Sequence, residues 1–119
     1  PLAQRAMEIL KPVQPFSSKT HVFPGGKKEK PLSNMAMSML LRRMGYDSIT
    51  VHGFRSSFRN WAGEQTNYPF EVCEQALAHR LPDAVAAAYL RSDFFERRAS
   101  LLADWSNYCQ SKCPTSTVA

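Results

Sequence analysis

The feature that most constrains the fold is a helical repeat of large apolar residues in the second half of the chain. Between residues 53 and 64 the apolar side chains recur at steps of three and four, which places them on one side of an α-helix. They are Phe54, Phe58, Trp61 and Ala62. A second repeat predicts a longer last helix that begins at Ser92 or Asp93. Its inward residues are Phe94, Leu101, Trp105 and Tyr108.

Proline and glycine divide the rest of the chain into short segments. Further helices are predicted over residues 2–10, 35–44, 71–78 and 84–90. The second of them is expected to begin at Ser33 or Asn34 as N-cap, to end at Gly45 and to bury its methionines in the core. Residues 49–51 form an extended connection, too short to predict as a strand, and Pro12–Pro31 is predicted to be a surface loop. The expected fold class is therefore mainly α, with little or no strand.

The length of 119 residues and the hydrophobic content of 44% allow one domain with a modest core. No apolar run approaches the roughly 20 residues that a membrane span requires. The opening segment 1–5 has neither an initiator methionine nor the order of a signal peptide, and it is expected to be a cut inside a longer protein. Residues 111–119 are predicted to be a polar tail.

The chain contains three cysteines, an odd number without a secretion signal, which predicts reduced thiols and a cytoplasmic protein. Cys109 and Cys113 lie four residues apart and, with His52 or His79, offer a conceivable metal site. Structural zinc sites usually show two closely spaced ligand pairs, and only one pair is visible here. No metal site is therefore predicted.

The net charge of +5 favours a polyanionic partner, because Lys and Arg that neutralise phosphates release counterions. The excess is uneven, since residues 1–30 carry a surplus of four positive charges and residues 31–119 a surplus of one. Lys27 and Lys28 belong to the basic cluster of the loop and are candidate contacts to DNA phosphates. A solvated loop is the alternative interpretation of this cluster.

The tetrapeptide His52-Gly53-Phe54-Arg55 opens a predicted helix. Residues three apart share a helix face with their Cβ atoms roughly 5–6 Å apart, so one phosphate could meet both His52 and Arg55. The backbone N–H groups at a helix N-terminus would add to the attraction for an anion. The alternative is that His52 caps the helix and Arg55 pairs with a surface carboxylate.

Two further residues with suitable chemistry follow. His79 comes at the end of the helix that includes Gln75-Ala76-Leu77-Ala78, where its side chain can turn into a cleft or simply satisfy the helix end. Tyr89 follows three alanines, which leave space around a phenol that must approach a bulky substrate. A buried tyrosine that completes a core is the alternative.

Taken in order, H-x-x-R, L-A-H and A-A-Y resemble the C-terminal signature of the tyrosine recombinases. The resemblance to prophage integrases extends to the sequence around these motifs. It covers residues 52–62, HGFRSSFRNWA, and residues 75–79, QALAH. The resemblance extends to about Cys109. It implies that residues 1–110 are part of an integrase catalytic domain, the C-terminal helical part of the DNA breaking and rejoining fold.

The resemblance also implies a mechanism without metal or nucleotide cofactor. Tyr89 would attack a DNA phosphodiester in line and form a 3′-phosphotyrosyl link. Arg55 would hold the non-bridging oxygens, His52 would act as general base or proton relay, and His79 would hydrogen-bond the scissile phosphate. Arg59 and Arg80 are further candidate DNA contacts.

The resemblance implies that two catalytic groups, a first Arg and a Lys that protonates the leaving oxygen, lie upstream of Pro1. We therefore expect the 119-residue chain alone to be inactive. The implied partners are double-stranded DNA attachment sites and other protomers, in a tetramer on DNA and a monomer or weak oligomer off DNA. No membrane partner is expected, and the implied location is the nucleoid of the bacterial cytoplasm.

Two other functions remain open from the residues alone. His52, His79 and Arg55 could perform metal-free acid and base catalysis on a phosphodiester, which would not need Tyr89. Alternatively, the helix that begins near Gly53 could lie in the major groove of a non-catalytic DNA-binding module. Base-specific binding that survives loss of Arg55 and Tyr89 would favour the second.

Overall fold

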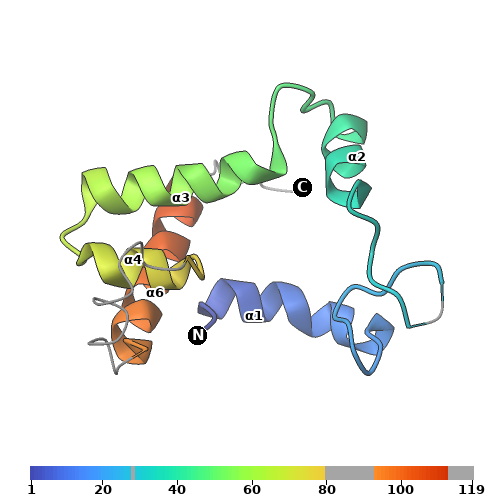
Figure 1. The fold of residues 1–119 in the computed structure, drawn as a ribbon, viewed down its shortest axis with the longest axis horizontal. Helices are drawn as coiled ribbons and strands as arrows, with labels where there is room; N and C mark the ends of the chain where they lie inside the picture. Colours follow the sequence, from blue (N-terminus) through green and yellow to red (C-terminus); the bar gives the residue numbers. More distant parts are fainter. Residues whose placement is uncertain (28, 80–92, 113–119) are drawn as a thin grey trace, which may run out of the picture. The chain divides into compact units, whose positions relative to one another are not determined.

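The computed structural model describes residues 1–27, 29–79 and 93–112, and these are mainly helical (Figure 1). The elements are α1 (Gln4–Leu10), the 3-10 helix η1 (Lys11–Phe16), α2 (Ala36–Arg43), α3 (Val51–Gln65), α4 (Phe70–Ala76) and α6 (Phe95–Lys112). The described residues form no β-strand, and their one isolated antiparallel bridge joins Pro24 and Pro31. The expectation of a mainly α fold is confirmed. The helix predicted over residues 84–90 lies outside the described residues.

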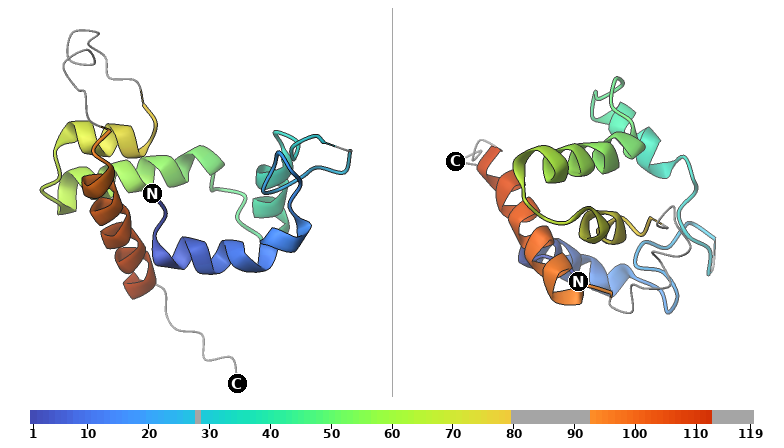
Figure 2. Two further views of the ribbon diagram at one scale, coloured as in Figure 1. Left: turned by 90° about the horizontal axis from the view of Figure 1, so that it is seen from below. Right: turned by 60° about the vertical axis from the view of Figure 1, so that its left-hand side comes forward.

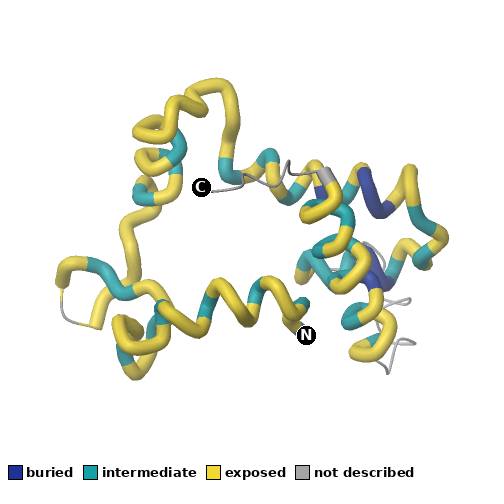
Figure 3. The backbone as a smooth tube through the Cα atoms, turned by 180° about the vertical axis from the view of Figure 1, so that it is seen from behind, coloured by how far each residue is buried: buried dark blue, intermediate teal, exposed yellow. Residues whose placement is uncertain are grey.

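The chain divides into two compact units. One comprises Pro1–Ala6 and Phe58–Ala119, and the other comprises Met7–Ser57. In the described part, the buried residues all belong to the first unit, and Figure 3 shows them in dark blue. None of the described helices is both long and apolar enough to cross a membrane.

The core of the first unit is built by the second half of α3 together with α4 and α6. Its buried residues are Phe58, Trp61, Ala62, Val72, Cys73 and Leu101. The two views of Figure 2 show α6, in orange to red, beside α4, in yellow. Trp105 of α6 packs on Trp61 with ring centroids 5.0 Å apart and on Phe58 edge to face at 5.5 Å. Aromatic pairs of this kind each add about 0.5–1.5 kcal/mol beyond their buried area.

The predicted apolar faces of these helices are largely confirmed. Phe54 is the exception, because its side chain is 58% exposed. It lies in the unit Met7–Ser57, where no described residue is buried. The end of the fourth predicted helix also differs, because α4 ends at Ala76 and not at Ala78.

In the unit Met7–Ser57 the methionines of α2 are exposed, and the prediction that they lie in a core is wrong. These exposed residues are Met35, Met37, Met39 and Met44. No described part of this unit covers the apolar stripe of α2, so the side chains stay in contact with solvent. The predicted N-cap is also wrong, because Met35 occupies that position without a side-chain cap, and Ser33 accepts a bond from Ala36 N–H through its backbone carbonyl.

The predicted end of α2 at Gly45 is confirmed. Gly45 has a positive φ of 80°, a conformation that glycine adopts without steric cost. Its N–H donates to the Arg42 carbonyl at 2.9 Å, and the N–H of Tyr46 donates to the Leu41 carbonyl at 2.9 Å. This pair of bonds is a Schellman motif, which satisfies carbonyls that the helix leaves open.

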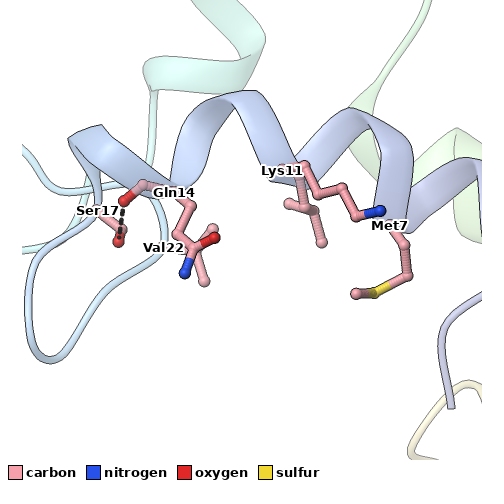
Figure 4. A pocket seen from close by; sticks show the side chains of 6 residues that line it. Met7, Lys11, Gln14, Ser17 and Val22 are labelled. Atoms are coloured by element: carbon pink, nitrogen blue, oxygen red, sulfur yellow. Dashed lines mark hydrogen bonds between the residues drawn. The ribbon is translucent and has the colours of Figure 1, made fainter.

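The first residues of the predicted loop Pro12–Pro31 form the 3-10 helix η1 instead. This helix can include Pro12 and Pro15 because it is short. An apolar hollow of about 280 Å³ is lined by Met7, Leu10, Lys11, Gln14, Ser17 and Val22 (Figure 4). At its rim the hydroxyl of Ser17 donates to the Gln14 carbonyl at 2.7 Å. None of the predicted site residues lines this hollow.

Candidate functional site

The first turn of α3 carries His52 and Arg55. The helix begins at Val51, two residues before the predicted start, because Thr50 serves as its cap. The N–H of Gly53 donates to the Thr50 hydroxyl at 3.0 Å, which is the bond that an N-cap side chain makes to the third helical residue. His52 therefore lies inside the first turn, and the alternative that it caps the helix is wrong.

The placement of His52 and Arg55 suits an anion. His52 is exposed and Arg55 is partly buried, and their spacing of three puts them on one helix face. The N-terminus of a 15-residue helix adds backbone N–H groups and the positive end of its dipole. A phosphate at this turn would meet a guanidinium, an imidazole and the positive end of the helix dipole together.

His79 is held by a second Schellman motif, at the end of α4 in the other unit. The N–H of Ala78 donates to the Gln75 carbonyl at 3.0 Å, and the N–H of His79 donates to the Glu74 carbonyl at 2.9 Å. The reversal requires a left-handed residue, and Ala78 adopts it with a φ of 53°. His79 is thereby turned back over the last turn of α4.

The side chain of Glu74 joins His79 to Arg59. Glu74 Oε2 lies 2.7 Å from Nδ1 of His79, and Glu74 Oε1 accepts from Nε of Arg59 at 2.5 Å. The guanidinium of Arg59 also lies over the ring of Phe70, 4.8 Å from its centroid. The side chain of Glu74 is only 13% exposed, whereas that of His79 is 39% exposed. A nearly buried carboxylate therefore connects α3 with an accessible imidazole.

The electrostatics of this network favour an ionised Glu74. Burial raises the pKa of its carboxyl group, but the hydrogen bonds from His79 and Arg59 and the charge of Arg59 outweigh burial, so that the pKa lies below its usual value. Cys73, next in sequence, behaves differently. Burial raises the pKa of its thiol more than the charge of Arg59 lowers it, so Cys73 acts as a core residue.

The predicted site residues fall into four groups. His52 and Arg55 share a helix turn in the unit Met7–Ser57, and Arg59 and His79 share Glu74 in the other unit. Tyr89, Arg80 and Lys28 lie outside the described residues. The remaining residue, Lys27, is exposed and lines a hollow of about 570 Å³ in the loop that Gly25 and Pro31 close.

Glu74 was not predicted as a site residue. The sequence offers one signal for it, because Glu74 is a charged residue on a helix whose neighbours Val72 and Cys73 are buried. A charge close to a core usually has a partner. Within the described residues no cluster of His, Cys, Asp and Glu could hold a metal ion.

Comparison with known proteins finds prophage integrases among the relatives of this chain. The chain is 33% identical to "Prophage integrase IntZ" of Escherichia coli K12 over 113 residues, which cover 93% of this chain and 28% of that protein. It is 33% identical to "Prophage integrase IntA" of the same strain over 110 residues, covering 90% of this chain and 26% of that protein. This homology, over 90% or more of the chain, relates it to the prophage integrases and through them to the tyrosine recombinases. "Prophage integrase IntS" is 26% identical over 121 residues, covering 94% of the chain and 30% of that protein.

The chain spans less than a third of the length of the curated relatives that it matches. No family model matches it, and no solved structure matches it significantly. The resemblance that the motifs carry is therefore supported by whole-chain similarity, whereas the roles of the individual residues stay predictions.

Proposed function

We propose that this chain is the C-terminal catalytic portion of a prophage integrase, which recombines DNA at specific sites through a 3′-phosphotyrosyl intermediate. The observation that carries the proposal is the similarity to prophage integrases over more than 90% of the chain. The position of His52 and Arg55 on the first turn of α3 agrees with it, because this arrangement suits a phosphate.

In the proposed reaction the hydroxyl oxygen of Tyr89 attacks the scissile phosphorus and the 5′-oxygen leaves. Arg55 holds the non-bridging oxygens in a bidentate manner and offsets the charge of the pentavalent transition state. His52 accepts or relays the proton of the phenol, and His79 donates a hydrogen bond to the phosphate. The phosphotyrosyl link keeps the energy of the broken bond for rejoining.

The proposed function needs groups beyond those described above. A second Arg and a Lys that protonates the leaving oxygen are supplied by the rest of the integrase. Removing one electrostatic donor from a transition state costs about 2.7–4 kcal/mol, so the 119-residue chain by itself forms no detectable covalent adduct with DNA. The complete enzyme assembles as a tetramer on its attachment sites in the bacterial cytoplasm.

The test is covalent capture of DNA by the complete integrase polypeptide. The probe is a labelled suicide-nicked duplex that carries the attachment sequence read from the prophage junctions. Tyr89→Phe abolishes the adduct, because only the phenol oxygen can form the link. Tyr46→Phe is the matched control, because Tyr46 is an exposed tyrosine with no role in the proposed chemistry, and it leaves the adduct yield unchanged.

Three results would contradict the proposal. Adduct formation that persists in Tyr89→Phe excludes this nucleophile. DNA cleavage without an adduct that requires His52 but not Tyr89 identifies a metal-free phosphodiesterase instead. Base-specific binding that survives the combined loss of Arg55 and Tyr89, with no cleavage in the wild type, identifies a DNA-binding module.

A further inference from the structure

The network of Arg59, Glu74 and His79 has a chemical consequence for His79. An ionised carboxylate can only accept hydrogen bonds, so the bond of 2.7 Å between Glu74 Oε2 and the ring requires a proton on Nδ1 of His79. The low pKa of Glu74 keeps the carboxylate ionised at neutral pH. A neutral His79 ring in this contact therefore carries its lone pair on Nε2.

This tautomer conflicts with a neutral ring that donates to a phosphate. The Nε2 lone pair would face the phosphate oxygens, which are themselves acceptors. The imidazolium form resolves the conflict, because it donates from both ring nitrogens at once. His79 then lies between two anions, the Glu74 carboxylate on Nδ1 and the phosphodiester on Nε2.

The backbone supports the same arrangement. The left-handed Ala78 turns the chain so that the N–H of His79 bonds to the Glu74 carbonyl, which brings the imidazole to the side chain of that same residue. Glu74 is in turn fixed by Arg59, whose guanidinium is held on the ring of Phe70. Glu74 thus contacts His79 twice and is anchored to α3, so its carboxylate has little freedom to turn away.

We propose that Glu74 is a positioning residue of the recombinase, which Arg59 fixes in place and which orients His79 so that the ring meets the scissile phosphate through Nε2 as an imidazolium. This inference rests on the proposed function, since it takes His79 as a phosphate contact. In this proposal Arg59 holds the Glu74 carboxylate in place, in addition to any contact that it makes with DNA. Carboxylates that orient a working histidine in other sites act in the same way, by fixing the tautomer and the ring.

The first experiment reads the tautomer directly. The 119-residue chain is labelled with ¹⁵N at its three histidines, and the ring nitrogen shifts of His79 are measured above neutral pH. The wild type shows the proton on Nδ1. Glu74→Gln preserves the shape but offers both an acceptor and a donor, so it admits the Nε2–H tautomer and shifts the ring signals.

Glu71→Gln is the matched control. Glu71 lies one turn earlier in α4, and its side chain makes no hydrogen bond or ion pair within the described ranges. The same chemical change there leaves the His79 signals where they are in the wild type. Ring signals of His79 that are identical in wild type, Glu74→Gln and Glu71→Gln would overturn the proposal.

The second experiment measures adduct formation by the complete integrase on the suicide-nicked duplex. Glu74→Gln slows it by about 10–100-fold, an effect as large as that of losing a carboxylate that orients a metal-bound histidine. Glu74→Asp, which keeps a carboxylate, recovers part of the rate, and Glu71→Gln retains the wild-type rate.

The outcomes separate the two proposals. A shifted tautomer in Glu74→Gln with an unchanged rate overturns the positioning role and leaves the proposed function intact. Adduct formation that survives Tyr89→Phe overturns the proposed function, whatever the tautomer of His79. A shifted tautomer together with a slower, Tyr89-dependent reaction supports both.

Discussion

Replacing Ala78 by glycine should stabilise the protein, although the same change usually destabilises a helical protein. Ala78 has a φ of 53°, where a residue with a Cβ atom costs about 1–2 kcal/mol relative to the right-handed region. Glycine removes this cost but increases the backbone entropy of the unfolded chain, which offsets about 0.4–1 kcal/mol. We expect a net gain of about 0.5–1 kcal/mol in the free energy of unfolding.

The assay is urea unfolding followed by circular dichroism, with Ala103→Gly as the control of opposite sign. Ala103 is exposed in the middle of α6, where glycine should destabilise by about 0.5–1 kcal/mol. Two alanine-to-glycine changes in one compact unit are thus expected to move the urea midpoint in opposite directions. Equal destabilisation by both would refute the left-handed conformation of Ala78 and, with it, the proposed geometry of His79.

Three further predictions concern the core and the titrating groups. Leu101 is fully buried, so Leu101→Ala should lower the free energy of unfolding by about 2–5 kcal/mol, measured by urea unfolding. The pKa of Tyr68 is raised to about 12 by burial and by its 2.7 Å hydrogen bond to Asp104, so Asp104→Asn should lower the pKa seen in an ultraviolet titration of Tyr68. The pKa of Glu74 lies below its usual value of 4.5, so its contribution to stability is complete above pH 4.5 and is lost as the pH falls through the lower folded value. Stability should therefore fall less between pH 7 and pH 3 in Glu74→Gln than in the wild type, and an equal fall would contradict the network.

The periodicity of apolar residues predicted most of the helical core. Phe58, Trp61 and Leu101 lie where the repeat placed them, because each belongs to a helix long enough for one face to be buried by its neighbours. The methionines of α2 carry an equally regular pattern and are nevertheless exposed. A pattern identifies the face that could be buried, but burial requires another element to cover it.

In the candidate site too, the sequence predicted relations within one helix but not contacts between helices. Spacing along one helix predicted that His52 and Arg55 share a turn, since three residues fix that relation locally. The contact of Glu74 with Arg59 joins two helices across 15 positions of sequence, and such pairs cannot be read from local spacing. The second Schellman motif was also hidden, because Ala78 stands where a glycine would have indicated a left-handed residue.

The aromatic cluster has a consequence for how unfolding of this chain can be followed. Trp61 and Trp105 are the two tryptophans of the sequence, and both belong to the unit that contains Phe58–Ala119. Tryptophan fluorescence therefore reports on that unit alone, whereas the helical residues of the segment Met7–Ser57, which include α2, contribute to circular dichroism but not to tryptophan emission. A difference between the two optical transitions would measure how far the two units melt independently.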